Sequence, residues 1–282
     1  MSVVVLGATG HLGRLTVEHL LEREVEPASI VAAGRAVERL SDLAERGVRV
    51  ERVDHGDPTS VRRVLEAGDR VLLVSGAEPD RVAQHRTVID AAAEAGVAQL
   101  VYTSGPYADR SSLLLMADHR ATEEHLAAAD VPTTVLRNAW YVENYTGQVR
   151  TYREHGMVGS AGDGRVSVAL RSEYAEAAAE VLTTDGHEGA TYELGGEAVT
   201  LPEIAAAISD VLGEQITYAD VPVAQLREIL AGAGMPAPMD EVFADVDRGI
   251  AAGELRVPGD DLATLLGRPA TPMHEAVAIA LR

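Results

Sequence analysis

The residues with the clearest chemical meaning in this sequence are three glycines near the start of the chain. They belong to the segment Gly7-Ala8-Thr9-Gly10-His11-Leu12-Gly13, which follows a short apolar run and precedes an amphipathic stretch. Such a loop lets bare backbone approach a pyrophosphate, and the helix after it presents N–H groups and a positive dipole end to the phosphates. The alternative is a glycine turn with a purely structural role. The motif in this context predicts a dinucleotide-binding loop made of Gly7, Thr9, Gly10, His11, Leu12 and Gly13.

The end of the second apolar run indicates which dinucleotide this loop would bind. The run closes with Ala32-Ala33-Gly34-Arg35, where an NAD-binding fold usually carries an acidic residue for the ribose hydroxyls. A guanidinium instead offers a fork of donors that suits a 2′-phosphate, and Arg39 follows one turn later. We therefore predict NADPH (NADP) as the cofactor, with Arg35 at its 2′-phosphate. An arginine merely solvated at a strand end is the alternative.

Polar residues also follow the next three apolar runs. Asp54 and His55 come after the third run, Ser75-Gly76 after the fourth and Thr103-Ser104 after the fifth. The carboxyl ends of parallel strands meet at one edge of a sheet, where ligands bind. We therefore expect Asp54, Ser75, Gly76, Thr103 and Ser104 to contact the cofactor. Ordinary loop polarity is the alternative for Ser75 and Thr103.

The chemistry must work without lysine, because all 24 basic residues of the chain are arginine. This excludes the Tyr-x-x-x-Lys pair of ordinary short-chain dehydrogenases, and Leu113–Ala117, where that acid would sit, contains no tyrosine. Quinones and delocalised cations accept hydride with little help from an acid, so orientation over a nicotinamide can suffice. The sequence therefore disfavours carbonyl reduction by that mechanism.

The few aromatic residues gather after the fifth and sixth apolar runs. Five of the ten are Tyr102, Tyr107, Trp140, Tyr141 and Tyr145, and both asparagines of the chain, Asn138 and Asn144, lie in the same segment as the last three. Rings would meet a flat aromatic acceptor, and amides would bind its oxygens. We predict catalytic roles for Asn138, Tyr141 and Asn144 and substrate binding by Tyr107, Trp140 and Tyr145. The alternative is that these rings only hold two lobes together.

His119 is the one histidine in the region that the missing Tyr/Lys pair would occupy. It is a candidate proton or hydrogen-bond donor to the substrate. A histidine satisfied on a helix face is the alternative. Glu123 stands four residues later, but two such residues do not form a metal site, so no metal is predicted.

These residues need a scaffold of alternating strands and helices. Apolar runs at Val3–Leu6, Ile30–Ala33, Val48–Val53, Val71–Val74, Leu100–Thr103 and Thr133–Leu136 alternate with amphipathic stretches such as Leu12–Glu24 and Arg81–Gly96. That pattern predicts right-handed βαβ crossovers and a parallel sheet covered on both faces. The fold class is therefore α/β, a doubly wound Rossmann sheet with a small α/β C-terminal lobe.

The domain boundaries follow from where this alternation loosens, after Arg137. We expect residues 1–150 to form the NADP-binding Rossmann domain, with 165–200 returning to it, and residues 201–282 to form a small lobe on the substrate side. The glycine-rich stretch Gly156–Gly164 is predicted to be a turn between two strands. Thr200-Leu201-Pro202-Glu203 is typical of a capping box that opens a helix.

Composition limits the partners. With 44 acidic residues against 24 arginines, the formal charge is −20, so a nucleic-acid or anionic-membrane partner is not expected. Cysteine is absent, which rules out disulfides and thiolate-metal sites. The N-terminal residues lack the pattern of a signal peptide, and no apolar run is long enough to span a bilayer. We expect a cytoplasmic protein, and a homodimer is one option that the sequence leaves open.

Taken together, these motifs resemble those of the NmrA-like, atypical short-chain dehydrogenase group, and within it the type 2 NADPH:quinone oxidoreductases and the triphenylmethane reductases. The similarity runs essentially from end to end and includes Gly7–Gly13, Ala32–Arg35, Tyr102–Ser104, Leu136–Tyr145 and Gly159–Arg165. It implies a Rossmann domain with a small lobe, NADPH, and a small-molecule acceptor of the quinone or related aromatic type, with 138–144 lining the nicotinamide pocket.

Two departures from that group concern the acceptor. Ala139 replaces the glycine usual in the quinone reductases, and Gly105-Pro106-Tyr107 differs from the usual loop after the fifth strand. Substrate identity therefore stays open. A tailoring reductase of an aromatic metabolite and a non-catalytic NADP(H) sensor or regulator that binds a protein partner are the alternatives to a quinone reductase.

Overall fold

A computed structural model describes all residues from Met1 to Arg282, and the chain divides into two compact units. The first unit contains residues 1–105, 118–137 and 171–192, and the second contains 106–117, 138–170 and 193–282. This division differs from the predicted one. Residues 106–117 and 138–170 both lie in the second unit, and 138–170 supplies strands that pair there and not in the large sheet.

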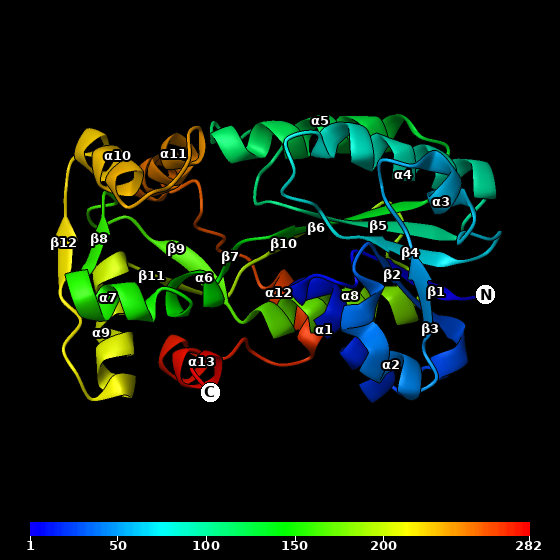
Figure 1. Cartoon of the computed structure of the whole chain (residues 1–282), viewed down its shortest axis with the longest axis horizontal. Helices are drawn as coiled ribbons and strands as arrows, with labels where there is room; N and C mark the ends of the chain where they lie inside the picture. Colours follow the sequence, from blue (N-terminus) through cyan, green and yellow to red (C-terminus); the bar gives the residue numbers. More distant parts are fainter. The chain divides into compact units, whose positions relative to one another are not determined.

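A seven-stranded sheet is the centre of the first unit (Figure 1), in the order β10-β6-β5-β4-β1-β2-β3. Its strands are β1 (Val3–Leu6), β2 (Ile30–Gly34), β3 (Arg49–Arg52), β4 (Arg70–Leu73), β5 (Gln99–Ser104), β6 (Thr133–Asn138) and β10 (Thr191–Leu194). Strands β1 to β6 pair in parallel. The order runs outward from β1 to β3, and the chain then crosses back to place β4 on the other side of β1. The predicted doubly wound α/β class is confirmed.

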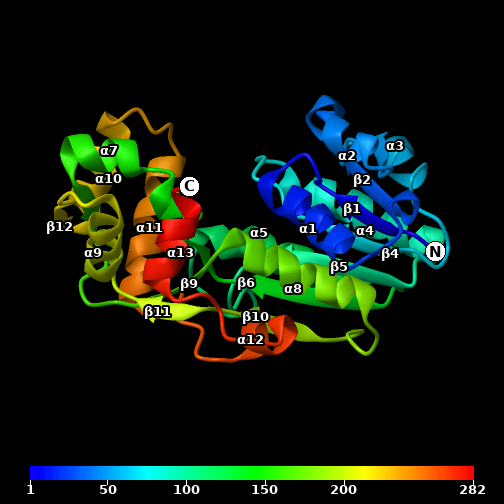
Figure 2. The ribbon, with the colours of Figure 1, turned by 90° about the horizontal axis from the view of Figure 1, so that it is seen from below.

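Helices cover both faces of this sheet, as Figures 1 and 2 show. Helices α3 (Pro58–Arg62), α4 (Arg81–Ala95) and α5 (Leu114–Ala128) lie on one face, and α1 (His11–Glu22), α2 (Ser41–Glu45) and α8 (Arg171–Thr183) lie on the other. The short 3₁₀ helices are η1 (Pro27–Ser29) and η2 (Val37–Leu40). Because both faces are covered, β1, β2 and β5 are buried along their whole length. The edge strand β3 is partly exposed.

Local capping residues set several helix ends. The Asp57 side chain accepts a hydrogen bond from the N–H of Thr59 and opens α3, with Pro58 at the first helical position. Gly96 closes α4 in the left-handed conformation at a φ of 68°. Thr200 and Glu203 form the expected capping box at the start of α9.

The second unit combines small sheets with several helices. Its strands are β7 (Trp140–Tyr141), β8 (Met157–Gly159), β9 (Val166–Ala169), β11 (Glu197–Val199) and β12 (Tyr218–Asp220). Its helices are α6 (Glu143–Thr146), α7 (Val149–His155), α9 (Leu201–Leu212), α10 (Val223–Gly232), α11 (Met239–Ala251), α12 (Asp261–Leu266) and α13 (Met273–Ala280). The predicted turn at 156–164 is wrong in its first part, because 157–159 pairs in parallel with 218–220 as β8.

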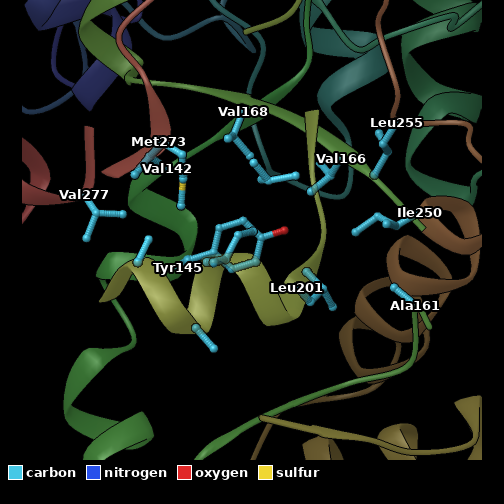
Figure 3. Close-up of a cluster of buried hydrophobic side chains, with 14 of the residues drawn as sticks. Val142, Tyr145, Ala161, Val166, Val168, Leu201, Ile250, Leu255, Met273 and Val277 are labelled. Atoms are coloured by element: carbon cyan, nitrogen blue, oxygen red, sulfur yellow. The ribbon is translucent and has the colours of Figure 1, made fainter. Parts of the chain in front are cut away.

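A compact hydrophobic core holds the second unit together. Figure 3 shows Tyr145 of α6 surrounded by side chains such as Val168, Leu201 and Met273, which come from β9, α9 and α13. Tyr145 is only 8% exposed. Apolar burial of this kind is the main source of stability for the unit.

Candidate functional site

The first unit carries a cavity of about 240 Å³ at the carboxyl ends of β1, β2, β3 and β4. This is the point where the strand order reverses between β1 and β4, which is where ligands bind in open α/β sheets. The cavity is lined by Gly7, Thr9, Gly10, Gly34, Arg35, Val53, Asp54, His55, Val74, Ser75, Gly76, Ala77, Glu78 and Gln84.

The glycine loop between β1 and α1 has the geometry that a phosphate cradle needs. Gly7 has a φ of +99°, and its N–H and that of Ala8 both donate to the carbonyl of Ala33 at 3.0 and 2.9 Å. A Cβ added at Gly10 would meet only the Gly7 carbonyl oxygen, at 3.3 Å, so the Gly10 backbone is otherwise uncovered. A Cβ at Gly13 would lie 2.4 Å from that oxygen. Gly13 therefore serves helix packing, and Gly10 leaves room for a ligand.

Arg35 lies at the rim of this cavity but already has a partner. One of its Nη atoms donates to the Glu78 carboxylate, which comes from the loop after β4. Although burial opposes it, hydrogen bonds from the backbone and from Arg35 lower the pKa of Glu78. The ion pair is partly open to solvent, with 62% of the Arg35 side chain exposed. A 2′-phosphate at Arg35 would have to compete with this carboxylate.

The polar residues after β4 and at the end of β5 have different surroundings. Ser75 and Gly76 line the cavity, and the Ser75 N–H donates to Thr103 Oγ1 at 2.9 Å. Thr103 and Ser104 are buried and do not line it. Ser104 Oγ instead donates to the Glu123 carboxylate at 2.6 Å. Thr103 therefore supports the cavity wall from behind, whereas Ser104 belongs to the cluster around Glu123.

Glu123 is the centre of a buried charged cluster. Arg137 forms a two-pronged bond to it, with Nε to Oε1 at 3.0 Å and Nη2 to Oε2 at 2.6 Å. The two side chains are 10% and 14% exposed. This geometry joins the end of β6 to α5, and it uses the glutamate that stands four residues after His119.

His119 is 6% exposed, and its Nδ1 lies 2.9 Å from the Tyr102 hydroxyl. Burial, helped by the positive charge of Arg81, lowers the pKa of His119 to about 3. The ring is therefore neutral near neutral pH, which favours hydrogen bonding by the neutral imidazole over proton donation by a charged one. The role of His119 toward a substrate stays a prediction.

A second buried histidine connects this region to the cavity. His85 Nε2 accepts the Gly76 N–H at 3.2 Å, and its Nδ1 lies 3.0 Å from Thr122 Oγ1. Burial lowers the pKa of His85 to about 4. Since Nε2 is the acceptor, the proton of the neutral ring is on Nδ1 and points to Thr122.

The aromatic segment predicted to meet the acceptor lies in the second unit. Trp140 and Tyr141 form β7 and pair with Val168 and Ala169 of β9. Asn138 is 5% exposed; its Nδ2 lies 3.4 Å from the Tyr141 hydroxyl, and its Oδ1 is buried without a hydrogen-bond partner. A buried amide oxygen without a donor is costly, and it points to a missing partner.

The other predicted acceptor residues are placed differently. Asn144 is exposed on α6, and Tyr145 packs in the core shown in Figure 3. A core position leaves no ring face for an acceptor, so it favours the structural alternative for Tyr145. Tyr107 lies in the second unit beside a separate surface hollow.

The fold thus brings together seven of the predicted cofactor residues: Gly7, Thr9, Gly10, Arg35, Asp54, Ser75 and Gly76. His11, Leu12 and Gly13 are not among the lining residues. Val53, Val74, Ala77, Glu78 and Gln84 line the cavity without having been predicted. The ends of the apolar runs pointed to Val53 and Val74, but nothing local to Glu78 indicates its pairing with Arg35.

The sheet order, the glycine loop at the reversal point and the cavity define a dinucleotide-binding Rossmann protein. The model of the NmrA-like family matches residues 1–251, and the chain belongs to that family. It is 38% identical over 279 residues to quinone oxidoreductase 2 of Escherichia coli, covering 98% of this chain and 97% of that protein.

Two solved structures extend the comparison. The fold matches the NADPH complex of the E. coli NADPH-dependent quinone oxidoreductase with a TM-score of 0.93 and 39% identity, over 99% of this chain and 100% of that one. It matches the NADP(H) complex of the Citrobacter sp. triphenylmethane reductase with a TM-score of 0.91 and 36% identity, over the same shares of the two chains. No helix of this chain has both the length and the apolar character needed to cross a membrane.

Proposed function

We propose that this protein is an NADPH-dependent reductase that transfers hydride to a quinone or a similar planar aromatic acceptor. The observation that carries the proposal is the cavity at the reversal point of the sheet, with an uncovered glycine loop on one side and Arg35 on its rim. The likeness to NADPH-dependent quinone and triphenylmethane reductases over nearly the whole chain supports the same activity.

The residues of the cavity fit NADPH. The N–H groups at the start of α1 and the bare backbone of Gly10 would bind the pyrophosphate, and Arg35 would bind the 2′-phosphate. Asp54 and His55 would flank the adenosine, and Ser75 and Gly76 would face the middle of the cofactor. When bound, NADPH supplies the hydride. The chain itself holds the cofactor in one orientation, which lowers the entropic part of the barrier.

On the acceptor side, we propose Asn138 as the principal hydrogen-bonding residue. Its Nδ2, the atom that can donate to an oxygen of the acceptor, is bonded only weakly, at 3.4 Å, to Tyr141. Tyr141 and Asn144 are proposed as further donors, and Trp140 as a wall. The neutral His119 is proposed only as a hydrogen-bond donor. No single strong acid is needed, because a quinone spreads the incoming charge over its ring and second oxygen.

The test is NADPH consumption with a panel of acceptors: 1,4-benzoquinone, menadione, malachite green and, as a contrast, cyclohexanone. We expect turnover with the quinones or the dye and none with cyclohexanone. Gly10→Val should abolish activity, and Asn138→Ala should lower kcat more than NADPH affinity. Reduction of the ketone alone would overturn the acceptor class. Tight NADPH binding with no turnover of any acceptor would instead support the sensor alternative. The cytoplasmic location and a homodimer stay predictions.

A further inference from the structure

The second unit contains a hollow of about 460 Å³ that is separate from the residues discussed for NADPH. The residues that matter for its chemistry are Tyr107, Arg110, Ser112, Gly253, Glu254 and Arg256. They come from the loop after β5 and from the segment after α11, about 145 positions apart in the chain. We call this feature the Tyr107 hollow.

The backbone at the Tyr107 hollow is held in an uncommon conformation. Tyr107 has a φ of +51°, one of two such values at non-glycine residues in the chain. Its N–H donates to both carboxylate oxygens of Glu193, at 3.2 and 3.1 Å, and its hydroxyl donates to the Arg256 carbonyl at 3.2 Å. These bonds fix the ring against the far segment. Conformations of this kind persist where the surroundings enforce them, and they gather at binding sites.

The charges of the Tyr107 hollow are unusual for so acidic a chain. Neither Arg110 nor Arg256 forms an ion pair with a carboxylate, although acidic residues outnumber arginines 44 to 24. The Arg110 guanidinium instead lies 4.3 Å over the Tyr107 ring. This stacking orients the guanidinium and leaves its N–H edge free of any acidic partner.

The carboxylate that lines the Tyr107 hollow is ionised but already has several bonding partners. Glu254 accepts hydrogen bonds from Ser111 Oγ at 2.7 Å, from the Ser112 N–H at 2.6 Å and from Ser112 Oγ at 2.7 Å, and it pairs with Arg248 at 3.3 Å. Although burial opposes it, these bonds lower the pKa of Glu254 to about 2. With Glu254 bonded in this way, the two arginines remain as the charges available to a ligand.

We propose that the Tyr107 hollow is a binding site for a small aromatic carboxylate. Arg110 and Arg256 would bind the carboxylate, because the planar guanidinium matches its two oxygens. The ring of the ligand would lie against the apolar surface of Tyr107 and Pro258. The overall charge of −20 repels anions at long range, so this binding depends on the local arginines. The proposal concerns binding alone and does not rest on the proposed reductase activity.

The experiment is isothermal titration calorimetry of the full-length protein with 2-naphthoate and with its neutral analogue 2-naphthalenemethanol, without NADPH. We expect saturable binding of 2-naphthoate and at least about ten-fold weaker binding of the alcohol, the lower end of what a charged hydrogen bond contributes. Arg110→Gln and Arg256→Gln should each weaken 2-naphthoate binding by about ten-fold or more.

The matched control is Arg150→Gln. Arg150 is an arginine of the same unit that lies outside the hollow, and its side chain is 94% exposed. This variant removes the same charge and should bind like the wild type, and melting temperatures should show that all three variants fold. If Arg150→Gln lost as much affinity for 2-naphthoate as the two hollow variants, the effect would come from the overall charge of the protein, and the proposal would be overturned. Unchanged binding in both hollow variants, or no saturable binding by the wild type at millimolar 2-naphthoate, would also overturn it.

Discussion

Replacing Glu78 by glutamine should tighten NADPH binding. In the structure, the Glu78 carboxylate accepts a hydrogen bond from the guanidinium of Arg35, the group that we propose binds the 2′-phosphate. The cofactor must break this ion pair before it can use the arginine, and the carboxylate also repels the incoming phosphate. Glutamine keeps the shape of the side chain, and its oxygen can still accept the Ala77 N–H, which lies 3.1 Å from Glu78 Oε2. The variant therefore removes the charge while preserving the loop.

The magnitude follows from the exposure of the pair. The Arg35 and Glu78 side chains are 62% and 31% exposed, and ion pairs this accessible contribute about 0.2–1 kcal/mol. Releasing Arg35 from the pair should therefore lower the Kd for NADPH by roughly 1.4- to five-fold. NADH lacks the 2′-phosphate, so its Kd should stay the same. Arg35→Ala should act in the opposite direction and raise the Kd for NADPH by about ten- to a hundred-fold, because it removes a charged hydrogen bond.

The assay is a titration of the change in NADPH fluorescence on binding, repeated with NADH at the same ionic strength. Glu94→Gln is the matched control, because Glu94 also pairs with an arginine, Arg62, and is 65% exposed, but it does not line the cavity. Equal tightening of NADPH and NADH by Glu78→Gln would refute the reasoning. Weaker NADPH binding in that variant would show that Glu78 holds Arg35 in place for the phosphate instead of competing with it.

Three further predictions concern the loop, the buried ion pair and the histidine. Gly10→Ala should weaken the binding of both NADPH and NADH with little change in melting temperature. Gly13→Ala should instead lower the melting temperature, because its methyl would lie 2.4 Å from a backbone oxygen. The reverse pattern would contradict the roles assigned to the two glycines. Arg137→Ala should destabilise the fold by about 3–5 kcal/mol in urea, since it leaves the Glu123 carboxylate buried without its partner; a loss below about 1 kcal/mol would disprove it. His119 binds a proton only near pH 3 when folded, so it is neutral throughout pH 5–8, and the profiles of kcat against pH for wild type and His119→Gln should have the same shape there. A step near pH 6.5 that only the wild type shows would mean that the ring titrates during catalysis.

Local sequence was sufficient where the interactions that shape the chain are themselves local. Gly7, Gly10 and Gly13 predict the phosphate loop because the turn and the start of α1 are built within seven residues. The Thr200 capping box was predictable for the same reason, since both of its hydrogen bonds join residues three positions apart. The alternation of apolar runs and amphipathic stretches similarly fixed the α/β class, because burial of strands and helices follows their own periodicity.

Other site properties depend on partners distant in sequence. Thr103 lies near the carboxyl end of β5 and Ser75 just after β4, yet Thr103 is buried behind the cavity wall, because exposure depends on what packs over a strand end. His119 has an ordinary local sequence, and only its burial beside Tyr102 lowers its pKa. Tyr145 belongs to a promising aromatic segment, but α6 turns its ring into the core.

The sequence by itself determined the Rossmann class and the phosphate loop, and it placed Arg35 at the end of β2, where an arginine favours NADPH. Tertiary structure alone decided that Glu78 meets Arg35 across 43 positions and that Arg110 and Arg256 share one hollow. The physical reason is the range of the forces involved. Backbone turns and helix caps are stabilised by neighbours in the chain, whereas ion pairing, desolvation and ring burial depend on which distant segments the packed sheet and core bring within a few ångströms.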